Sequence, residues 1–219
     1  MKTTMQREEV IVGAGPNVLH ADLVVPDSPA GIVVFAHGSG SSRFSPRNRA
    51  VAGTLNEGGL ATLLLDLLSL DEQRIDDLTG HLRFDIGLLA DRVAGAIDWV
   101  GGEERTRGLN IGLFGASTGA AAALVAAAKR PDSVAAVVSR GGRPDLAGNL
   151  PDVKAPVLLI VGGYDTAVIE MNRDAARQLL CKNRIEIVPG AGHLFEEPGK
   201  LERVAELARD WFVRHMKGQ

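Results

Sequence analysis

The sequence predicts a doubly wound α/β protein, in which helices cover both faces of a mostly parallel sheet. Apolar runs such as 61–65 and 157–161 are continuous rather than alternating, which is typical of strands buried on both faces. Segments with helical patterns separate these runs, and no long linker, repeat or low-complexity tract interrupts the alternation. With 219 residues the chain is long enough for one well-filled core. We therefore expect a single domain over residues 1–219.

The N-terminal segment differs from the rest, because its apolar residues alternate with polar ones. Residues 10–12 and 18–25 are expected to pair as antiparallel strands around the turn Gly13-Ala14-Gly15-Pro16-Asn17. This turn resembles the start of a dinucleotide-binding fingerprint. Its third glycine is missing, however, and a strand rather than a helix follows, so we expect no nucleotide site there.

The remaining elements follow in order along the chain. Further strands are expected at 32–36, 60–66, 109–114, 134–139, 156–161 and 184–188, and helices at 47–57, 85–100, in the alanine-rich stretch after Ser117, at 167–180 and at 199–216. The acid-rich segment 71–85 is assigned no helix and is a candidate wall of a cleft. The connection between Ser139 and Pro156 is too short to hold a large helical lid.

Ser117 is the candidate nucleophile. It stands in Gly115-Ala116-Ser117-Thr118-Gly119, a GxSxG sequence that follows an apolar strand and opens a helix. A sharp strand-to-helix turn lifts the serine hydroxyl above the sheet edge, and the two glycines let strand and helix approach closely. A serine hydroxyl is a weak nucleophile at neutral pH, so a base and a carboxylate are expected elsewhere in the chain.

Asp165 and His193 are the candidate acid and base. Each follows a buried strand and a glycine turn, at the carboxyl edge where open α/β sheets place their sites. Asp145, which also follows a strand, remains an alternative acid. The other histidines fit structural or surface positions; they are His20, His37, His81 and His215. The order Ser117, Asp165, His193 matches a hydrolase triad.

The developing oxyanion requires oriented N–H donors. Thr118, at the N-terminus of the helix after the nucleophile, offers one. Ser39, in the loop His37-Gly38-Ser39-Gly40, is the expected second donor. Three arginines follow this loop closely enough for one to bind an anionic substrate, although they also fit a solvated helix start; they are Arg43, Arg47 and Arg49.

Composition excludes several other classes of function. The formal net charge is −3 and Lys and Arg are spread along the chain, so we expect neither a nucleic-acid partner nor a membrane surface. The start of the chain has no apolar segment typical of a secretion signal, which predicts a cytoplasmic protein. The single Cys181 cannot form an internal disulfide and is expected to be a small buried residue.

Four segments resemble the dienelactone hydrolase-like branch of the α/β-hydrolases: HGSGSSRFSPRN, GASTGAAAA, LLIVGGYDTAVIE and PGAGHLFEEPG. The resemblance covers nearly the whole chain. It implies an eight-stranded, mostly parallel sheet, no metal and no organic cofactor, with Ser117, Asp165 and His193 as the triad. Dienelactone hydrolases proper carry cysteine at the nucleophile position, where this chain has serine, so a general carboxylester hydrolase is the safer expectation.

The expected reaction is hydrolysis of small or short-acyl esters through an acyl-enzyme on Ser117. A thioesterase or acyltransferase with the same triad is an alternative enzyme, and a hydrolase-like binding scaffold with an idle triad is a non-enzymatic one. Dehalogenase chemistry is disfavoured because it requires a carboxylate nucleophile. The expected partner is a small ester molecule, and the sequence leaves the oligomeric state open.

Overall fold

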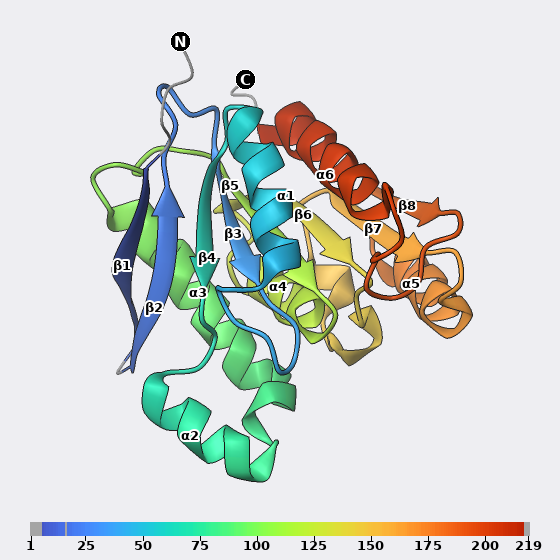
Figure 1. Cartoon of the computed structure of the whole chain (residues 1–219), viewed down its shortest axis with the longest axis horizontal. Helices are drawn as coiled ribbons and strands as arrows, with labels where there is room; N and C mark the ends of the chain where they lie inside the picture. Colours follow the sequence, from blue (N-terminus) through green and yellow to red (C-terminus); the bar gives the residue numbers. More distant parts are fainter. Residues whose placement is uncertain (1–5, 16, 217–219) are drawn as a thin grey trace.

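The computed structural model describes residues 6–15 and 17–216, and these form an α/β fold around one sheet (Figure 1). The sheet has eight strands in the order β1-β2-β4-β3-β5-β6-β7-β8 within the described residues. The strands are β1 (Arg7–Ala14), β2 (Asn17–Val24), β3 (Ile32–Ala36), β4 (Ala61–Leu65), β5 (Ile111–Ala116), β6 (Val134–Arg140), β7 (Val157–Gly162) and β8 (Asn183–Val188). β2 pairs antiparallel with β1 and β4, and the remaining pairs are parallel.

Helices cover both faces of the sheet, as the continuous apolar strands predict (Figure 1). The helices are α1 (Pro46–Glu57), α2 (Leu70–Thr79), α3 (Ile86–Gly102), α4 (Thr118–Lys129), α5 (Thr166–Gln178) and α6 (Lys200–Met216), with short 3-10 helices at 82–84, 144–146 and 150–152. α1 and α6 pack on one face around Phe114 and Phe212. α3 and α4 pack on the other, where consecutive buried alanines of α4 allow a close approach.

The predicted α/β class and the mostly parallel sheet are confirmed, and nearly all element bounds agree within a few residues. The turn between β1 and β2 joins the expected antiparallel pair, although Pro16 lies outside the described residues. The connection from β6 to β7 holds only the 3-10 helices at 144–146 and 150–152 and no large lid. Cys181 lies just beyond the end of α5, partly buried, and burial raises the pKa of its thiol.

The segment 71–85, to which the sequence pattern assigned no helix, contains one. α2 occupies 70–79 and projects from the rest of the molecule at the bottom of Figure 1. The sequence signal was local rather than periodic: the Ser69 hydroxyl accepts from the Glu72 N–H, and the Glu72 carboxylate accepts from the Ser69 N–H. Asp76 is the one buried residue of this helix, so the segment lacks the wide apolar stripe that reveals a core helix.

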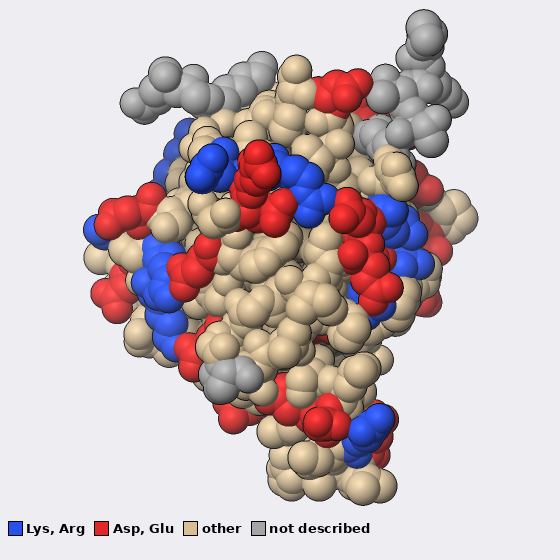
Figure 2. Space-filling model, turned by 90° about the vertical axis from the view of Figure 1, so that its left-hand side faces the viewer, with Lys and Arg blue, Asp and Glu red and all other residues tan. Residues whose placement is uncertain are grey.

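The molecular surface carries charges of both signs. Figure 2 shows acidic and basic side chains interspersed around the face over the β1 edge of the sheet, without a large patch of one sign on the described part of that face. Among the described helices, none combines the length and the apolar character needed to cross a membrane.

Candidate active site

Ser117 stands on a strained turn between β5 and α4. Its φ of 51° and ψ of −121° lie in a region that residues other than glycine rarely adopt. Two glycines make this turn possible. A Cβ on Gly115 would lie 2.4 Å from the Cα of Ala120, and one on Gly119 would lie 2.3 Å from the carbonyl oxygens of Ala36 and His37. The GxSxG spacing therefore brings the start of α4 against the end of β3.

The end of β6 holds the Ser117 backbone in place. The Ser117 N–H donates to the Arg140 carbonyl oxygen at 3.2 Å, and the Ser117 carbonyl oxygen accepts from the Arg143 N–H at 3.2 Å. These bonds offset the cost of the unusual dihedral angles. They also place Arg140, the last residue of β6, next to the candidate nucleophile.

Asp165 and His193 lie together at the carboxyl edge of the sheet. The Asp165 Oδ2 atom is 2.5 Å from the His193 Nδ1 atom, although the residues are 28 positions apart in sequence. Asp145 is engaged elsewhere, because its two carboxylate oxygens accept from the Arg143 guanidinium at 2.8 and 2.7 Å. These bonds hold the pKa of the Asp145 carboxyl below its usual value. The geometry thus favours Asp165 as the partner of His193.

The two candidate oxyanion donors are also adjacent. Thr118 is the first residue of α4, where a backbone N–H has no acceptor within the helix. The Ser39 N–H points at the same residue and donates to the Thr118 Oγ1 atom at 2.9 Å. An oxyanion that used the Ser39 N–H would therefore have to replace the Thr118 hydroxyl as its acceptor.

Ser117 and His193 line a cavity of about 230 Å³. Its remaining walls come from the loop after β3, the first turn of α1, the end of β6 and Leu194. The lining contains two guanidinium groups, those of Arg47 and Arg140. Arg140 is missing from the residues that the sequence pattern singled out, although its signal resembles that of Asp165: it ends a buried strand and precedes two glycines at the carboxyl edge.

Of the three arginines considered from the sequence, Arg47 alone lines the cavity that contains Ser117. Its Nη1 atom donates to the exposed Glu196 carboxylate at 2.9 Å. Arg43 is largely covered and forms ion pairs with Asp22, Asp66 and Glu9. Arg49 pairs with Asp22 and lies over the ring of Phe44. Arg43 therefore joins the loop after β3, and Arg49 joins α1, to the acidic residues of the β2 and β4 region.

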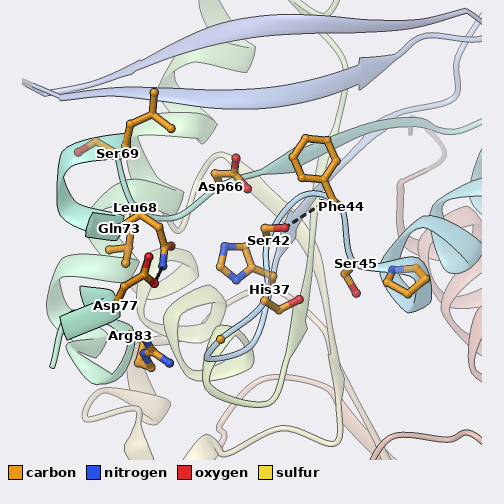
Figure 3. A pocket seen from close by; sticks show the side chains of 14 residues that line it. His37, Ser42, Phe44, Ser45, Asp66, Leu68, Ser69, Gln73, Asp77 and Arg83 are labelled. Atoms are coloured by element: carbon orange, nitrogen blue, oxygen red, sulfur yellow. Dashed lines mark hydrogen bonds between the residues drawn. The ribbon is translucent and has the colours of Figure 1, made fainter. Parts of the chain in front are cut away.

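A larger cavity of about 500 Å³ lies beside this one, and the two share Ser41 and Ser45. Figure 3 shows it between the loop that carries Ser42 and Phe44 and the α2 segment that carries Gln73 and Asp77. Residues of the segment 71–85 thus do line a cleft. His37, in the wall, accepts from the Leu67 N–H through Nε2 at 3.1 Å, and burial lowers its pKa, consistent with a structural role for a neutral ring.

The fold and the strained serine turn at its carboxyl edge define an α/β-hydrolase. The family model of the dienelactone hydrolase family matches residues 19–217. The chain belongs to the dienelactone hydrolase family, as the sequence motifs predict.

Individual relatives agree on the fold. A crystal structure of a dienelactone hydrolase from Anabaena variabilis is 59% identical, with a TM-score of 0.96 over 98% of this chain and 100% of that chain. A Xanthomonas campestris structure described as an α/β serine hydrolase without a lid has a TM-score of 0.76 at 20% identity, over 98% and 97% of the two chains.

The curated relatives carry a different name. A Mycobacterium tuberculosis (H37Rv) protein named "Putative phosphoribosyl transferase" is 55% identical over 215 residues, which cover 98% of this chain and 48% of that protein. The chain therefore spans about half the length of the curated relatives that it matches.

Proposed function

We propose that the protein hydrolyses carboxylic esters of small substrates, with Ser117 as nucleophile, His193 as base and Asp165 as the orienting acid. One observation carries the proposal: a serine held at positive φ on the strand-to-helix turn shares a cavity with a histidine whose Nδ1 lies 2.5 Å from a carboxylate. An isolated serine in a glycine-rich turn has no need of this strained backbone.

In the proposed reaction, His193 Nε2 removes the proton of Ser117 as its oxygen attacks the ester carbonyl carbon. Asp165 accepts a hydrogen bond from His193 Nδ1–H, which fixes the tautomer and stabilises the imidazolium. The tetrahedral intermediate collapses, and His193 donates its proton to the departing alkoxide, which leaves as the alcohol. Water then attacks the acyl-enzyme in the same way, releasing the carboxylic acid and restoring the Ser117 hydroxyl.

The proposed oxyanion donors are the N–H groups of Thr118 and Ser39. Thr118 supplies the positive end of the α4 dipole as well as its amide. Ser39 exchanges its bond to the Thr118 hydroxyl for one to the oxyanion, which is favourable because hydrogen bonds to charged acceptors are about twice as strong. Thr118→Val removes the competing acceptor, so activity is expected to persist in that variant if Ser39 serves the oxyanion.

The cavity at Ser117 indicates a small group on at least one side of the scissile bond. The adjoining cavity between Phe44 and α2 provides room for a more distant part of the substrate. The phosphoribosyl transferase name belongs to relatives about twice as long, and we propose ester hydrolysis for the half that this chain matches.

Labelling by a fluorophosphonate and hydrolysis of p-nitrophenyl acetate test the proposal directly. Wild-type protein is expected to react with both, and Ser117→Ala with neither, while the thermal transition of the variant stays near that of the wild type. Loss of the nucleophile typically removes several orders of magnitude in rate. Full activity in purified Ser117→Ala, or an unlabelled wild-type serine, would refute the assignment.

A further inference from the structure

The cavity at Ser117 is rich in hydrogen-bond donors, and none of the described residues that line it carries a carboxylate. Its side chains include those of Ser39, Ser41, Ser45, Asn48 and two arginines, and the backbone lining adds Gly38 and Ala116. Glu196, which is exposed and outside this lining, pairs with Arg47, and Asp165 pairs with His193. The two guanidinium charges are therefore only partly balanced by protein groups at this position.

Arg140 is the least compensated of these charges. It is 7% exposed, and only its Nη2 atom has a partner among the described residues, the Asn48 Oδ1 atom at 3.3 Å. Its Nε and Nη1 atoms are buried without a partner there. Burial, and secondarily the like charge of Arg47, lower the pKa of Arg140 to about 10, so it remains protonated at neutral pH. Burying a cation without an anion is costly, and a negatively charged ligand would offset that cost.

Two further positive groups face the same cavity from α1. Arg47 lies in the first turn of α1, and its Nε atom is buried without a partner in the described structure. The 12-residue helix also directs its N-terminus here, because Ser45, Arg47 and Asn48 all line the cavity. The Ser45 hydroxyl caps the Asn48 N–H and Pro46 has no N–H, so the contribution of this N-terminus is mainly the positive end of the helix dipole.

We propose that these groups bind a phosphate carried by the ester substrate, so that Arg140, Arg47 and the N-terminus of α1 form a phosphate subsite beside Ser117. The inference rests on the proposed ester hydrolysis for the identity of the substrate, but not for phosphate binding itself. The two guanidinium groups carry two positive charges, and the one carboxylate that pairs with them is largely exposed to solvent, which suits a dianion. Donors that come from both β6 and α1 suit a tetrahedral group better than a planar carboxylate.

The position of Arg140 also explains why the phosphate would belong to the reacting molecule. Arg140 pairs with Ala116 in the sheet, one residue before the nucleophile, and its carbonyl oxygen accepts from the Ser117 N–H. A ligand on the Arg140 side chain therefore occupies the same small cavity as the ester bound at Ser117.

Three acetate esters that differ only at the end of the alcohol test the charge preference: 2-acetoxyethyl phosphate, 3-acetoxypropanoate and the neutral 2-methoxyethyl acetate. Acetate release gives kcat/KM for each. The phosphate ester is expected to exceed the neutral ester by about 10- to 100-fold, as a charge-assisted contact provides. This ratio is expected to collapse in Arg140→Gln and to fall in Arg47→Gln, but to persist in Arg209→Gln, a partly exposed arginine that pairs with Asp210 and does not line the cavity.

Calorimetric titration with inorganic phosphate tests binding separately from catalysis. Phosphate is expected to bind wild-type protein and Ser117→Ala, and to bind at least tenfold more weakly to Arg140→Gln and Arg47→Gln. Hydrolysis of the neutral ester without phosphate binding would overturn this inference and leave the proposed function intact. Phosphate binding without hydrolysis of any ester would instead overturn the proposed function. A preference for the carboxylate ester, or a phosphate preference unchanged in both arginine variants, would overturn the phosphate subsite.

Discussion

Substitution of Gly119 by alanine tests whether the serine turn depends on close contact between α4 and β3. The added Cβ would lie 2.3 Å from the carbonyl oxygens of Ala36 and His37, about 0.7 Å inside the closest approach of real Cβ atoms. Both obstacles are backbone atoms, so the first turn of α4 must move. Overpacking of this kind costs up to about 3 kcal/mol or more. A displacement approaching 1 Å at Ser117 is expected to lower kcat/KM by about 100-fold.

Gly53 provides the matched control, because it is also a helical glycine and an added Cβ there meets no atom within 4 Å. Gly53→Ala is expected to raise the free energy of unfolding by about 0.5–1 kcal/mol through the better helix propensity of alanine. Urea unfolding measures both changes, and hydrolysis of p-nitrophenyl acetate measures activity. If Gly119→Ala matched Gly53→Ala in stability and in rate, close packing would not explain the second glycine of the motif.

Three further expectations concern the acid, the α2 segment and the substrate. Asp165→Asn is expected to lower kcat by about 10⁴-fold and Asp145→Asn by far less, because only the partner of His193 controls its tautomer; reversed effects would move the acid to Asp145. Burial opposes ionisation of Asp76, but hydrogen bonds from Arg83 outweigh it and lower the pKa of Asp76. The stabilisation from this pair is therefore present above about pH 4 and lost as the pH falls through the folded-state pKa. The difference in Tm between wild type and Asp76→Asn should shrink accordingly in thermal scans at lower pH, and a constant difference would contradict the role of the pair. Among p-nitrophenyl esters, kcat/KM is expected to be highest for short acyl chains, and a preference for about twelve carbons, at roughly 0.8 kcal/mol per buried CH₂, would contradict the small cavity.

Two features that the sequence analysis did not identify, helix α2 and the buried charge of Arg140, were missed for different physical reasons. Periodicity detects helices that bury a wide apolar stripe, and α2 leaves Leu78 89% exposed and buries only Asp76. Its capping box, Ser69 with Glu72, is a local signal and was readable from the sequence. Arg140 also has a local signal, since it ends a buried strand before two glycines, but that signal is not specific, because many strands end in a charged residue that is simply solvated.

The sequence by itself determined the features that depend on neighbouring residues. Strand, glycine turn and helix around Ser117 are contiguous, and so are the strand ends before Asp165 and His193, which is why the class of fold and the candidate triad could be predicted. The tertiary structure decided which groups meet across the sheet. The pair Asp165 and His193, and the bond from Ser39 to Thr118 over 79 positions, follow from strand order and register. The burial of the Arg140 charge likewise depends on α1, because Asn48 of that helix contacts Arg140 although the two residues are 92 positions apart in sequence. A local pattern cannot encode such contacts, because desolvation and pairing of a charge depend on every element packed around it.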